Sequence, residues 1–577
     1  MTPTVRSKKE LEHITLSPTD TVGDVVHIFA THKPAETGLP AGIVLVSSKE
    51  GVLQGIITHG DLNRALAAGT SFAEVVSKIM NPKPFVVVGP LSNQEIIKVV
   101  TEKVRNDQLH KTRLEKIIVV DHARKVLNVM SFFDAWQGSD VGNKRVGIVG
   151  LGYVGLTLGL TLADLGFTVR AYDTNPDIKK MVRAKKAPFF EDGLMPLLRQ
   201  FVGNRFTVVD TFEEPQGCEV YFIAVGTPLD AKKVPSLDHL KSAAEHLGKV
   251  LKKGDLVVLR STVPLGTTRT VVTPLLEKHS GLVAGEDFFI AFAPERTIEG
   301  KALQELRTLP QVIGGINHAS SNTAAAVFNR MTSSTLVVNS LEEAEMVKLI
   351  NNTYRDVMFG FANEIALVCQ KWDIDTNDVI HAANMGYPRS NVPKPSPGVG
   401  GYCLEKDPYI LMHSAREKGY EPNIALHARN ANTDILSALS HDIVVFLKTE
   451  AKKKNPKIFI LGFAFKGKPA TSDMRGSTTT TLVRGLQQQG YTNIYGYDAV
   501  VSPDEIKSLG VTAVTKLQDG FKDADVVVVM NNHEALEKLD VLKYALPSKK
   551  PVLFIDTWAL YDRATFAQIS GVRYRRI

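Results

Sequence analysis

Arg145-Val146-Gly147-Ile148-Val149-Gly150-Leu151-Gly152-Tyr153-Val154-Gly155 is the stretch that decides the fold of this 577-residue chain. It joins a short apolar strand to a G-x-G-x-x-G turn, and an apolar helix then continues to about Leu165. A second strand follows over 168–173 and ends in an acidic residue. Strand, glycine turn, helix, strand and terminal acid together predict a doubly wound α/β domain over 144–334 that binds a dinucleotide.

Each glycine of this turn has its own expected task. Gly150 makes the tight turn, Gly152 lets a pyrophosphate approach the backbone, and Gly155 lets helix and strand pack closely. Asp173 is expected to accept hydrogen bonds from a ribose diol and to repel a 2′-phosphate, which favours NAD over NADP. A turn of purely structural use is the alternative. The expected cofactor contacts in this segment are Gly150, Gly152, Tyr153, Val154, Gly155 and Asp173.

Polar residues follow the ends of three further predicted strands, at 220–225, 256–259 and 288–293. The strands lead into Gly226-Thr227-Pro228, Ser261-Thr262-Val263-Pro264 and Pro294-Glu295-Arg296. Ligands of a doubly wound sheet bind at the carboxyl ends of its strands. We therefore expect these three segments to border one crevice.

A thiol lies in a glycine-rich loop further along the chain, Gly398-Val399-Gly400-Gly401-Tyr402-Cys403-Leu404-Glu405-Lys406-Asp407-Pro408. An alcohol dehydrogenase needs no cysteine nucleophile, whereas oxidation of an aldehyde to an acid through a thioester does. Cys403 therefore indicates an enzyme that holds its substrate covalently, and a buried free cysteine is the alternative. Cys218 and Cys369 show no C-x-x-C spacing, so neither a metal site nor a disulfide is expected.

The segment 335–450 is expected to be helical and 456–577 to be a second α/β domain. Leu341 to Trp372 has apolar residues at helical spacing and no proline, which predicts one long helix. Lys348 and Asn352 are four residues apart and would share one face of it. Because the C-terminal domain lacks a G-x-G-x-x-G turn, it is expected to bind a different ligand or part of one.

Residues 1–140 contain a repeated unit. A strand, turn, strand and helix start over 43–62 returns over 117–136. Two such units in tandem would bury a core that neither could bury alone. The pairs Thr58/Asp61 and Ser131/Asp134 resemble the ribose contacts of tandem CBS domains, which often bind adenine nucleotides. The alternative is that each pair caps a helix.

Composition excludes several other classes of protein. The length predicts three or four domains. The formal charge of +7 is spread along the chain, and its densest run, 452–457, is typical of a solvated linker rather than a nucleic-acid site. No apolar stretch follows the polar N-terminus, and no window approaches the roughly 18 apolar residues of a membrane span. A cytoplasmic protein is expected.

The motifs occur in the order found in the UDP-glucose/GDP-mannose dehydrogenase family, and residues 144–577 resemble that family from end to end. The resemblance implies an α/β fold with two Rossmann-like doubly wound domains joined by a helical dimerisation core, to which 1–140 adds an α+β tandem CBS-like module. It also implies NAD-dependent oxidation of the C6 hydroxyl of a UDP-sugar to the uronate. This reaction consumes two NAD⁺ and passes through a thiohemiacetal and a thioester on a cysteine, in a homodimer or higher oligomer.

The resemblance assigns catalytic roles residue by residue. Cys403 is the implied nucleophile, and Lys348 stabilises charge on the reacting oxygen. Glu295 is implied to activate water during thioester hydrolysis. Asp407 has a structural alternative, because Asp followed by Pro408 is typical of a helix start. The implied catalytic set is Cys403, Lys348, Asn352, Glu295, Asp407 and Thr262.

The resemblance also implies binding roles. Lys466 would bind the uridine diphosphate, and Arg475 would lie near the NAD pyrophosphate. Arg389 would reach the substrate of the neighbouring subunit. The further implied cofactor contacts are Thr227, Thr262 and Glu299, and the implied substrate contacts are Glu295, Arg296, Lys348, Asn352, Arg389, Gly400 and Lys466.

The substrate signals are mixed. Pro294-Glu295-Arg296 and the segment 387–392 resemble the UDP-N-acetylhexosamine branch (UDP-GlcNAc or UDP-ManNAc), whereas Lys406 resembles UDP-glucose enzymes. Two departures affect the C-terminal domain: 465–475 is about two residues longer than usual, and Trp558 replaces the usual arginine. Two other functions are alternatives. A two-electron hydroxyacid dehydrogenase leaves the thiol unexplained, and a nucleotide-sensing protein with an inactive dehydrogenase part does not need the intact catalytic set.

Overall fold

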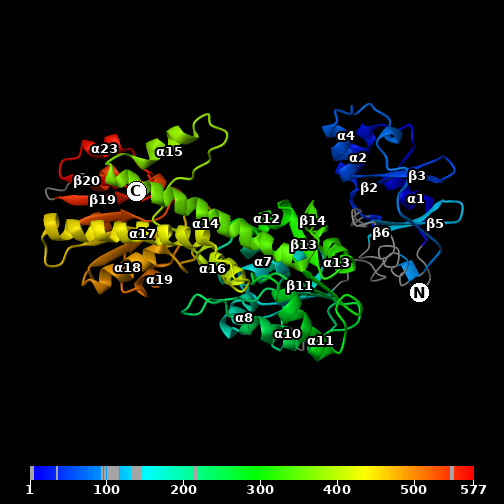
Figure 1. The fold of residues 1–577 in the computed structure, drawn as a ribbon, viewed down its shortest axis with the longest axis horizontal. Helices are drawn as coiled ribbons and strands as arrows, with labels where there is room; N and C mark the ends of the chain where they lie inside the picture. The colour runs from blue at the N-terminus through cyan, green and yellow to red at the C-terminus, as the bar shows by residue number, and fades with distance from the viewer. Residues whose placement is uncertain are drawn as a thin grey trace.

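The computed structural model describes residues 5–33, 37–91, 95, 96, 99, 116–131, 145–211, 217–545 and 551–577. Within these ranges the strands form one eight-stranded, one six-stranded and two three-stranded sheets. The helix α14 (Leu341–Lys371) extends from the eight-stranded sheet to the six-stranded sheet, as Figure 1 shows. The predicted α/β class with a helical central part is confirmed.

The eight-stranded sheet has the order β14-β13-β12-β11-β10-β7-β8-β9, and all its pairs are parallel except β12 with β13. Every residue of β10 and β11 is buried, because helices cover both faces of the sheet. The strands are β7 (Arg145–Val149), β8 (Thr168–Tyr172), β9 (Phe206–Val208), β10 (Val220–Ile223), β11 (Leu256–Leu259), β12 (Phe289–Phe292), β13 (Gln311–Gly315) and β14 (Thr335–Val337). The helices are α7 (Tyr153–Asp164), α8 (Pro176–Arg183), α9 (Leu194–Phe201), α10 (Asp238–Val250), η4 (Thr268–Val272), α11 (Thr273–Ser280), α12 (Ala302–Thr308) and α13 (His318–Phe328).

The helical central part confirms the long helix expected over 341–372, because α14 is 31 residues long. It packs against the two other long helices of this part, and Figure 1 shows α17 running beside it. The remaining helices are α15 (Thr376–Asn384), α16 (Tyr402–Arg416), α17 (Asn423–Phe446) and η5 (Leu447–Ala451).

The structural alternative for Asp407, as the cap of a helix that begins at Pro408, is wrong. Helix α16 begins at Tyr402 after the cap residue Gly401, and Pro408 lies inside it. A proline within a helix leaves the carbonyl four residues earlier without its usual N–H donor. That carbonyl belongs to Leu404, and the Arg429 guanidinium of α17 lies 3.5 Å from it. A contact from a neighbouring helix thus replaces the missing donor, which no local pattern could indicate.

The C-terminal sheet has the order β17-β16-β15-β18-β19-β20, and all its pairs are parallel. Its strands are β15 (Ile458–Leu461), β16 (Ile494–Tyr497), β17 (Thr512–Ala513), β18 (Val526–Val529), β19 (Val552–Asp556) and β20 (Val572–Arg576). Its helices are α18 (Thr478–Gln488), α19 (Pro503–Lys507), α20 (Leu517–Phe521), α21 (Glu534–Glu537), α22 (Val541–Ala545) and α23 (Arg563–Ala567). Two apolar clusters cover its two faces.

The N-terminal part contains two sheets of the same topology, β1-β2-β3 and β4-β5-β6. In each, the first pair is parallel and the second antiparallel, and the register shifts near the end of the second pair. The matching topology supports the predicted repeat. The elements are α1 (Lys8–Leu11), η1 (Glu12–Ile14), β1 (Thr15–Leu16), α2 (Val22–Thr31), β2 (Ile43–Ser47), β3 (Leu53–Thr58), α4 (His59–Ala67), η2 (Val76–Lys78), β4 (Val86–Val88), β5 (Lys116–Val120) and β6 (Val126–Ser131).

The structure gives the first hydroxyl–aspartate pair its capping geometry. Thr58 accepts a hydrogen bond from the Asp61 backbone N–H, and the Asp61 carboxylate accepts bonds from the Thr58 N–H and hydroxyl at 2.8 and 2.6 Å. Asp134 and the side chain of Ser131 lie outside the described residues. Among the helices of the described part, none combines the length and the apolar character needed to cross a membrane.

Candidate active site

The glycine turn between β7 and α7 has the geometry that the sequence predicts. Gly150 has a φ of +99°, and a Cβ there would lie 2.6 Å from the Ala224 carbonyl oxygen. A Cβ at Gly155 would lie 1.8 Å from the Gly150 carbonyl oxygen, so only glycine allows this packing. A Cβ at Gly152 would instead project into open space. The turn is therefore closed toward the sheet and open at the start of α7.

The start of α7 fits the pyrophosphate of NAD. Gly152 is the cap residue and offers no side-chain acceptor to the first N–H groups of the 12-residue helix, so these donors can bind an anion. Asp173 follows β8, and its carboxylate accepts hydrogen bonds from the backbone N–H groups of Leu151 and Asn175 at 2.6 and 2.7 Å. These bonds fix the carboxylate beside the turn, where a ribose diol would meet it.

Tyr153 connects the glycine turn to the segment after β12. Its hydroxyl makes a short hydrogen bond to the Glu191 carboxylate and accepts a bond from the Gly300 N–H at 3.0 Å. Glu191 also accepts from Gly300 N–H at 2.7 Å and is buried. Burial and the Glu191 charge raise the pKa of Tyr153, so its hydroxyl stays protonated. Glu191 was not among the predicted residues.

Cys403 lies in the first turn of α16, where glycines let the cysteine loop lie directly against the segment at Gly476. The Gly401 N–H donates to the Gly476 carbonyl at 3.1 Å, and a Cβ at Gly400 would lie 2.6 Å from the same oxygen. Cys403 is exposed, whereas Cys218 and Cys369 are buried. Protein atoms nevertheless surround the Cys403 thiol closely, and this burial together with Asp407 raises its pKa, against the opposing charges of two lysines. Cys403 is thus exposed as a residue, although many protein atoms lie near its sulfur.

A chain of hydrogen bonds and one ion pair joins four of the predicted residues through Lys406. Asn352 donates to Asp407 Oδ2 at 2.6 Å, and the Lys406 ammonium lies 2.8 Å from Asp407 Oδ1. Lys406 also reaches the Thr227 hydroxyl at 3.4 Å, and Thr227 donates to the Thr262 carbonyl oxygen at 2.6 Å. The chain connects α14 and α16 to the carboxyl ends of β10 and β11. The sequence marked Lys406 only as a substrate signal and not as a site residue.

Glu295 is buried at the carboxyl end of β12 and forms a short ion pair with Arg260. Its other carboxylate oxygen accepts the backbone N–H groups of Arg296 and Thr297, each at 2.8 Å. Burial by itself would raise the pKa of Glu295, but the charges of Arg260 and Lys348 and these hydrogen bonds hold it below its ordinary value. Glu295 is therefore a carboxylate beside Lys348, a buried residue of α14. Arg260 was not predicted.

A second charged group lies where the segment after β12 meets the C-terminal domain. Lys466 donates to the Glu299 carbonyl oxygen at 2.7 Å, and Arg475 pairs with Asp473 at 2.7 Å. The Arg475 guanidinium also lies 5.1 Å from the centre of the Tyr402 ring. Burial and the charge of Asp473 raise the pKa of the Glu299 carboxyl to about 7, and burial lowers the pKa of Lys466 to about 8.

Two predicted substrate contacts do not face this site within the single chain. The Arg296 guanidinium makes a short hydrogen bond to the Pro310 carbonyl oxygen. Arg389 is exposed in the segment before the cysteine loop and lies over the Tyr387 ring, 4.5 Å from its centre. Among the described residues, no group of three or more His, Cys, Asp and Glu side chains could hold a metal ion.

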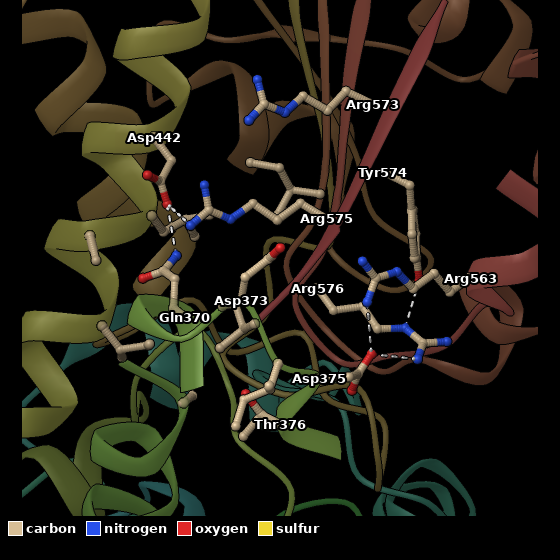
Figure 2. A pocket seen from close by; sticks show the side chains of 17 residues that line it. Gln370, Asp373, Asp375, Thr376, Asp442, Arg563, Arg573, Tyr574, Arg575 and Arg576 are labelled. Atoms are coloured by element: carbon tan, nitrogen blue, oxygen red, sulfur yellow. Dashed lines mark hydrogen bonds and ion pairs between the residues drawn. The ribbon is translucent and has the colours of Figure 1, made fainter. Parts of the chain in front are cut away.

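A cavity of about 380 Å³ lies elsewhere, between α14, α17 and β20. Figure 2 shows two of its arginines directed at acidic side chains: Arg575 pairs with Asp442 at 2.7 Å, and Arg576 with Asp375 at 3.3 Å. It contains none of the predicted site residues. These pairs attach β20 to α17 and to the cap residue of α15.

Sequence models of the three domains of the UDP-glucose/GDP-mannose dehydrogenase family match this chain. The NAD binding domain matches residues 144–332, the central domain 342–434 and the UDP binding domain 459–563. A CBS domain model matches residues 7–68. The matched ranges contain the glycine turn, the cysteine loop and the charged group at the C-terminal domain.

Known relatives agree with these matches. UDP-N-acetyl-D-mannosamine dehydrogenase of Pyrococcus horikoshii is 30% identical over 397 residues, which is 69% of this chain and 91% of that protein. NDP-N-acetyl-D-galactosaminuronic acid dehydrogenase of Ralstonia solanacearum is 32% identical over 412 residues, 70% of this chain and 93% of that protein.

Solved structures show the same fold. UDP-D-ManNAc dehydrogenase from Pyrococcus horikoshii superposes with a TM-score of 0.67 at 28% identity, over 75% of this chain and 99% of that one. A UDP-glucose dehydrogenase from Pyrobaculum islandicum gives 0.65 at 26% identity, over 76% and 98%. The chain belongs to the UDP-glucose/GDP-mannose dehydrogenase family and is an NAD-dependent nucleotide-sugar dehydrogenase with an N-terminal CBS domain.

Proposed function

We propose that this enzyme oxidises the C6 hydroxyl of a UDP-N-acetylhexosamine, UDP-GlcNAc or UDP-ManNAc, to the uronate in one active site. The observation that carries the proposal is that Cys403 is exposed among the charges of Lys348, Asp407 and Lys406, on a chain that also has the glycine turn expected for NAD. Several relatives are named for N-acetylated amino sugars, which favours this substrate class. UDP-glucose is the second candidate, because Lys406 is part of the site and resembles the lysine of UDP-glucose enzymes.

The reaction converts R-CH2OH, two NAD⁺ and water into R-COO⁻, two NADH and three protons. NAD supplies the hydride acceptor for both oxidations. Lys348 stabilises the alkoxide form of the C6 oxygen as its proton leaves, and loss of a hydride from C6 gives the aldehyde. The Cys403 sulfur adds to the aldehyde carbon to give a thiohemiacetal, and loss of a second hydride gives a thioester.

Hydrolysis then releases the product. Water adds to the thioester carbon, the C–S bond breaks and the sulfur leaves as the thiolate of Cys403. In this proposal Glu295, Asp407 and Thr262 hold the water. Glu295 is a carboxylate and a hydrogen-bond acceptor, so it can orient the water and accept a proton as the water attacks. The Asn352–Asp407 bond supports a second fixed acceptor close to the sulfur.

Charged groups of the C-terminal domain are proposed to bind the anionic parts of both ligands. Lys466 is assigned to the substrate diphosphate and Arg475 to the cofactor pyrophosphate. Arg389 is assigned to the substrate of a second subunit, since its side chain is exposed and lies over the Tyr387 ring rather than against the site of its own chain. The homodimer is supported by an exposed apolar stripe on α14, formed by Ile350, Tyr354, Phe361, Val368 and Trp372.

The N-terminal module is proposed to bind an adenine nucleotide and regulate the enzyme. Its CBS match and the hydroxyl–aspartate pair at Thr58 and Asp61 support this proposal. Because the Thr58 hydroxyl already donates to Asp61, a ribose diol would have to share or replace that hydrogen bond.

The deciding experiment counts NADH formed per sugar consumed, with UDP-GlcNAc, UDP-ManNAc, UDP-GalNAc, UDP-glucose and GDP-mannose. Two NADH per sugar are expected for one N-acetylated substrate, with loss of turnover but not of substrate binding in Cys403→Ala. One NADH per sugar would contradict the thioester route. A full rate in Cys403→Ala would contradict the covalent mechanism.

A further inference from the structure

Arg260 is the largest side chain buried completely in the described part of the molecule, and its only ion pair there is with Glu295. It follows the last residue of β11, and Glu295 lies just beyond the end of the neighbouring strand β12. Both residues therefore lie at the carboxyl edge of the NAD-binding sheet. The contact joins two strand ends that the sequence separates by 35 residues.

A third strand fixes the arginine. Because β13 runs antiparallel to β12, its first residue, Gln311, also lies at this edge. Arg260 donates to the Gln311 side-chain oxygen at 3.1 Å, and the Gln311 amide donates to the Pro294 carbonyl oxygen at 3.0 Å. The guanidinium carbon also lies 5.3 Å from the centre of the Phe328 ring. The direction of the guanidinium is thus set before any ligand binds.

Stability alone is a poor reason for this arrangement. A buried ion pair is often no more stabilising than apolar side chains of the same volume. Arg260 also leaves its Nε–H without a hydrogen-bond partner among the described residues, which is unfavourable for a buried donor. The guanidinium instead serves its neighbour, because it holds one Glu295 oxygen while two backbone N–H groups hold the other.

We propose that Arg260 is a positioning residue for the oxidation of the nucleotide-sugar, which fixes the Glu295 carboxylate and keeps it ionised beside Lys348. The inference rests on the proposed function only where it gives Glu295 a part in the chemistry. The charges that act on Glu295 are those of Arg260 after β11, Lys348 from α14 and the neighbouring Arg296. Removal of Arg260 takes away the largest of the effects that oppose burial and leaves Lys348, Arg296 and the backbone hydrogen bonds, so the carboxyl group should take up a proton at a higher pH.

The test compares Arg260→Gln and Arg260→Lys with the control Arg269→Gln. Arg269 lies in η4, further along the chain from Arg260, and forms a solvent-accessible ion pair with Glu342 of α14. In Arg260→Gln the acid limb of the kcat profile should move up by about 1–3 pH units, as expected for loss of a charge in contact. Arg260→Lys should move it less, and Arg269→Gln should follow the wild type. An unchanged acid limb in a folded Arg260→Gln protein, with only a lower rate or stability, would overturn the proposal.

A second readout does not depend on turnover. Infrared difference spectra across a pH titration detect the carboxylic acid form, and the band of residue 295 is identified by its loss in Glu295→Gln. It should appear at higher pH in Arg260→Gln, or in Arg260→Lys if the glutamine variant does not fold. If no nucleotide-sugar is oxidised but the band shifts, the proposed function fails and this inference stands. If the band does not shift in either variant, the inference is wrong even for an active enzyme.

Discussion

Cys403 is surrounded by charges of both signs, and their balance decides how its thiol ionises. Burial and Asp407 raise its pKa, whereas Lys348 and Lys406 lower it. The raised pKa favours the thiol form at neutral pH, so in the proposed mechanism the thiolate that attacks the aldehyde must form within the site. A thiol that ionises only in the presence of substrate would also be protected from adventitious oxidation.

Replacement of Asp407 should separate reactivity from catalysis. In Asp407→Asn a negative charge next to the sulfur disappears, so the pKa of Cys403 should fall and alkylation by iodoacetamide at pH 7 should become faster. Turnover should fall by about 100-fold or more, because the same carboxylate is proposed to hold water. Mass spectrometry of the labelled peptide, followed against pH, measures the first effect.

The buried Cys218 and Cys369 should not compete for the reagent. Glu286→Gln, which changes an exposed carboxylate away from the site, is the matched control and should alter neither rate. Slower alkylation in Asp407→Asn would mean that the carboxylate assists ionisation of the thiol instead of opposing it.

A residue of the site was predictable where a single local motif defines it. It was not predictable where its role depends on contact between two segments that are distant in the sequence. Gly150, Gly152 and Gly155 follow from local spacing alone. Arg260 and Lys406 are recognised as site residues only through their contacts. Arg260 contacts Glu295, 35 positions away in the sequence, and Lys406 contacts Thr227, 179 positions away. A charged residue directly after an apolar strand, at an edge where ligands bind, was the available signal for Arg260.

At the scale of elements, α14 is the part that holds the site together. Its buried face carries polar residues at helical spacing, and each is directed at a different segment of the site. Glu345 binds the backbone after the Thr262 segment, Asn352 binds Asp407, and Asn363 accepts the Ser396 N–H at 2.8 Å before the cysteine loop. The sequence predicted the helix and the shared face of Lys348 and Asn352. The sequence could not predict which residues these side chains bind, because the bound segments lie both before and after α14 in the sequence and meet only in the fold.

Glu345 gives this helix a measurable pH dependence. Its carboxyl group accepts the Gly266 N–H at 2.5 Å and the Thr268 N–H and hydroxyl at 2.9 and 2.6 Å, and burial still raises its pKa from 4.5 to about 7. A pKa raised in the folded state means that the folded protein binds the proton more tightly. The associated stability is present below pH 4.5 and is lost as pH rises through 7.

Glu345→Gln should therefore remove a pH-dependent term of about 3 kcal/mol, since each pKa unit corresponds to about 1.4 kcal/mol. Thermal midpoints at pH 5 and pH 8 measure it: the wild type should lose more stability across this interval than the variant. Glu364→Gln, on the exposed side of α14, should behave as the wild type. An equal loss in wild type and Glu345→Gln would show that this carboxyl group is ionised in the folded protein across the whole interval.

At the scale of the whole molecule, the N-terminal module adds to the matched dehydrogenase domains a part whose only proposed use is regulation. If it binds an adenine nucleotide, ATP, ADP or AMP should change the apparent KM or kcat at a fixed sugar concentration. Asp61→Ala should abolish the change while leaving the rate without nucleotide intact, because Asp61 lies outside the dehydrogenase domains. Calorimetry on the full chain provides the binding readout. Identical kinetics with all three nucleotides, together with no heat of binding, would refute the regulatory role.

The apolar stripe on α14 links the proposed dimer to the same helix that organises the site. Phe361 is 50% exposed and Trp372 78% exposed in a single chain, and with Ile350, Tyr354 and Val368 they follow one face at intervals of four and seven residues. A contiguous apolar face of this kind is typical of a subunit interface. An aspartate at its centre would have to be buried without a partner, so Phe361→Asp should convert a dimer into a monomer in analytical ultracentrifugation. Val283→Asp, at an exposed valine of the NAD-binding domain, should leave the dimer intact.

If Arg389 completes the site of the neighbouring subunit, the monomer should also lose kcat/KM and should keep its affinity for NAD. A Phe361→Asp variant that stays dimeric would place the interface on another surface, and a fully active monomer would remove Arg389 from the site.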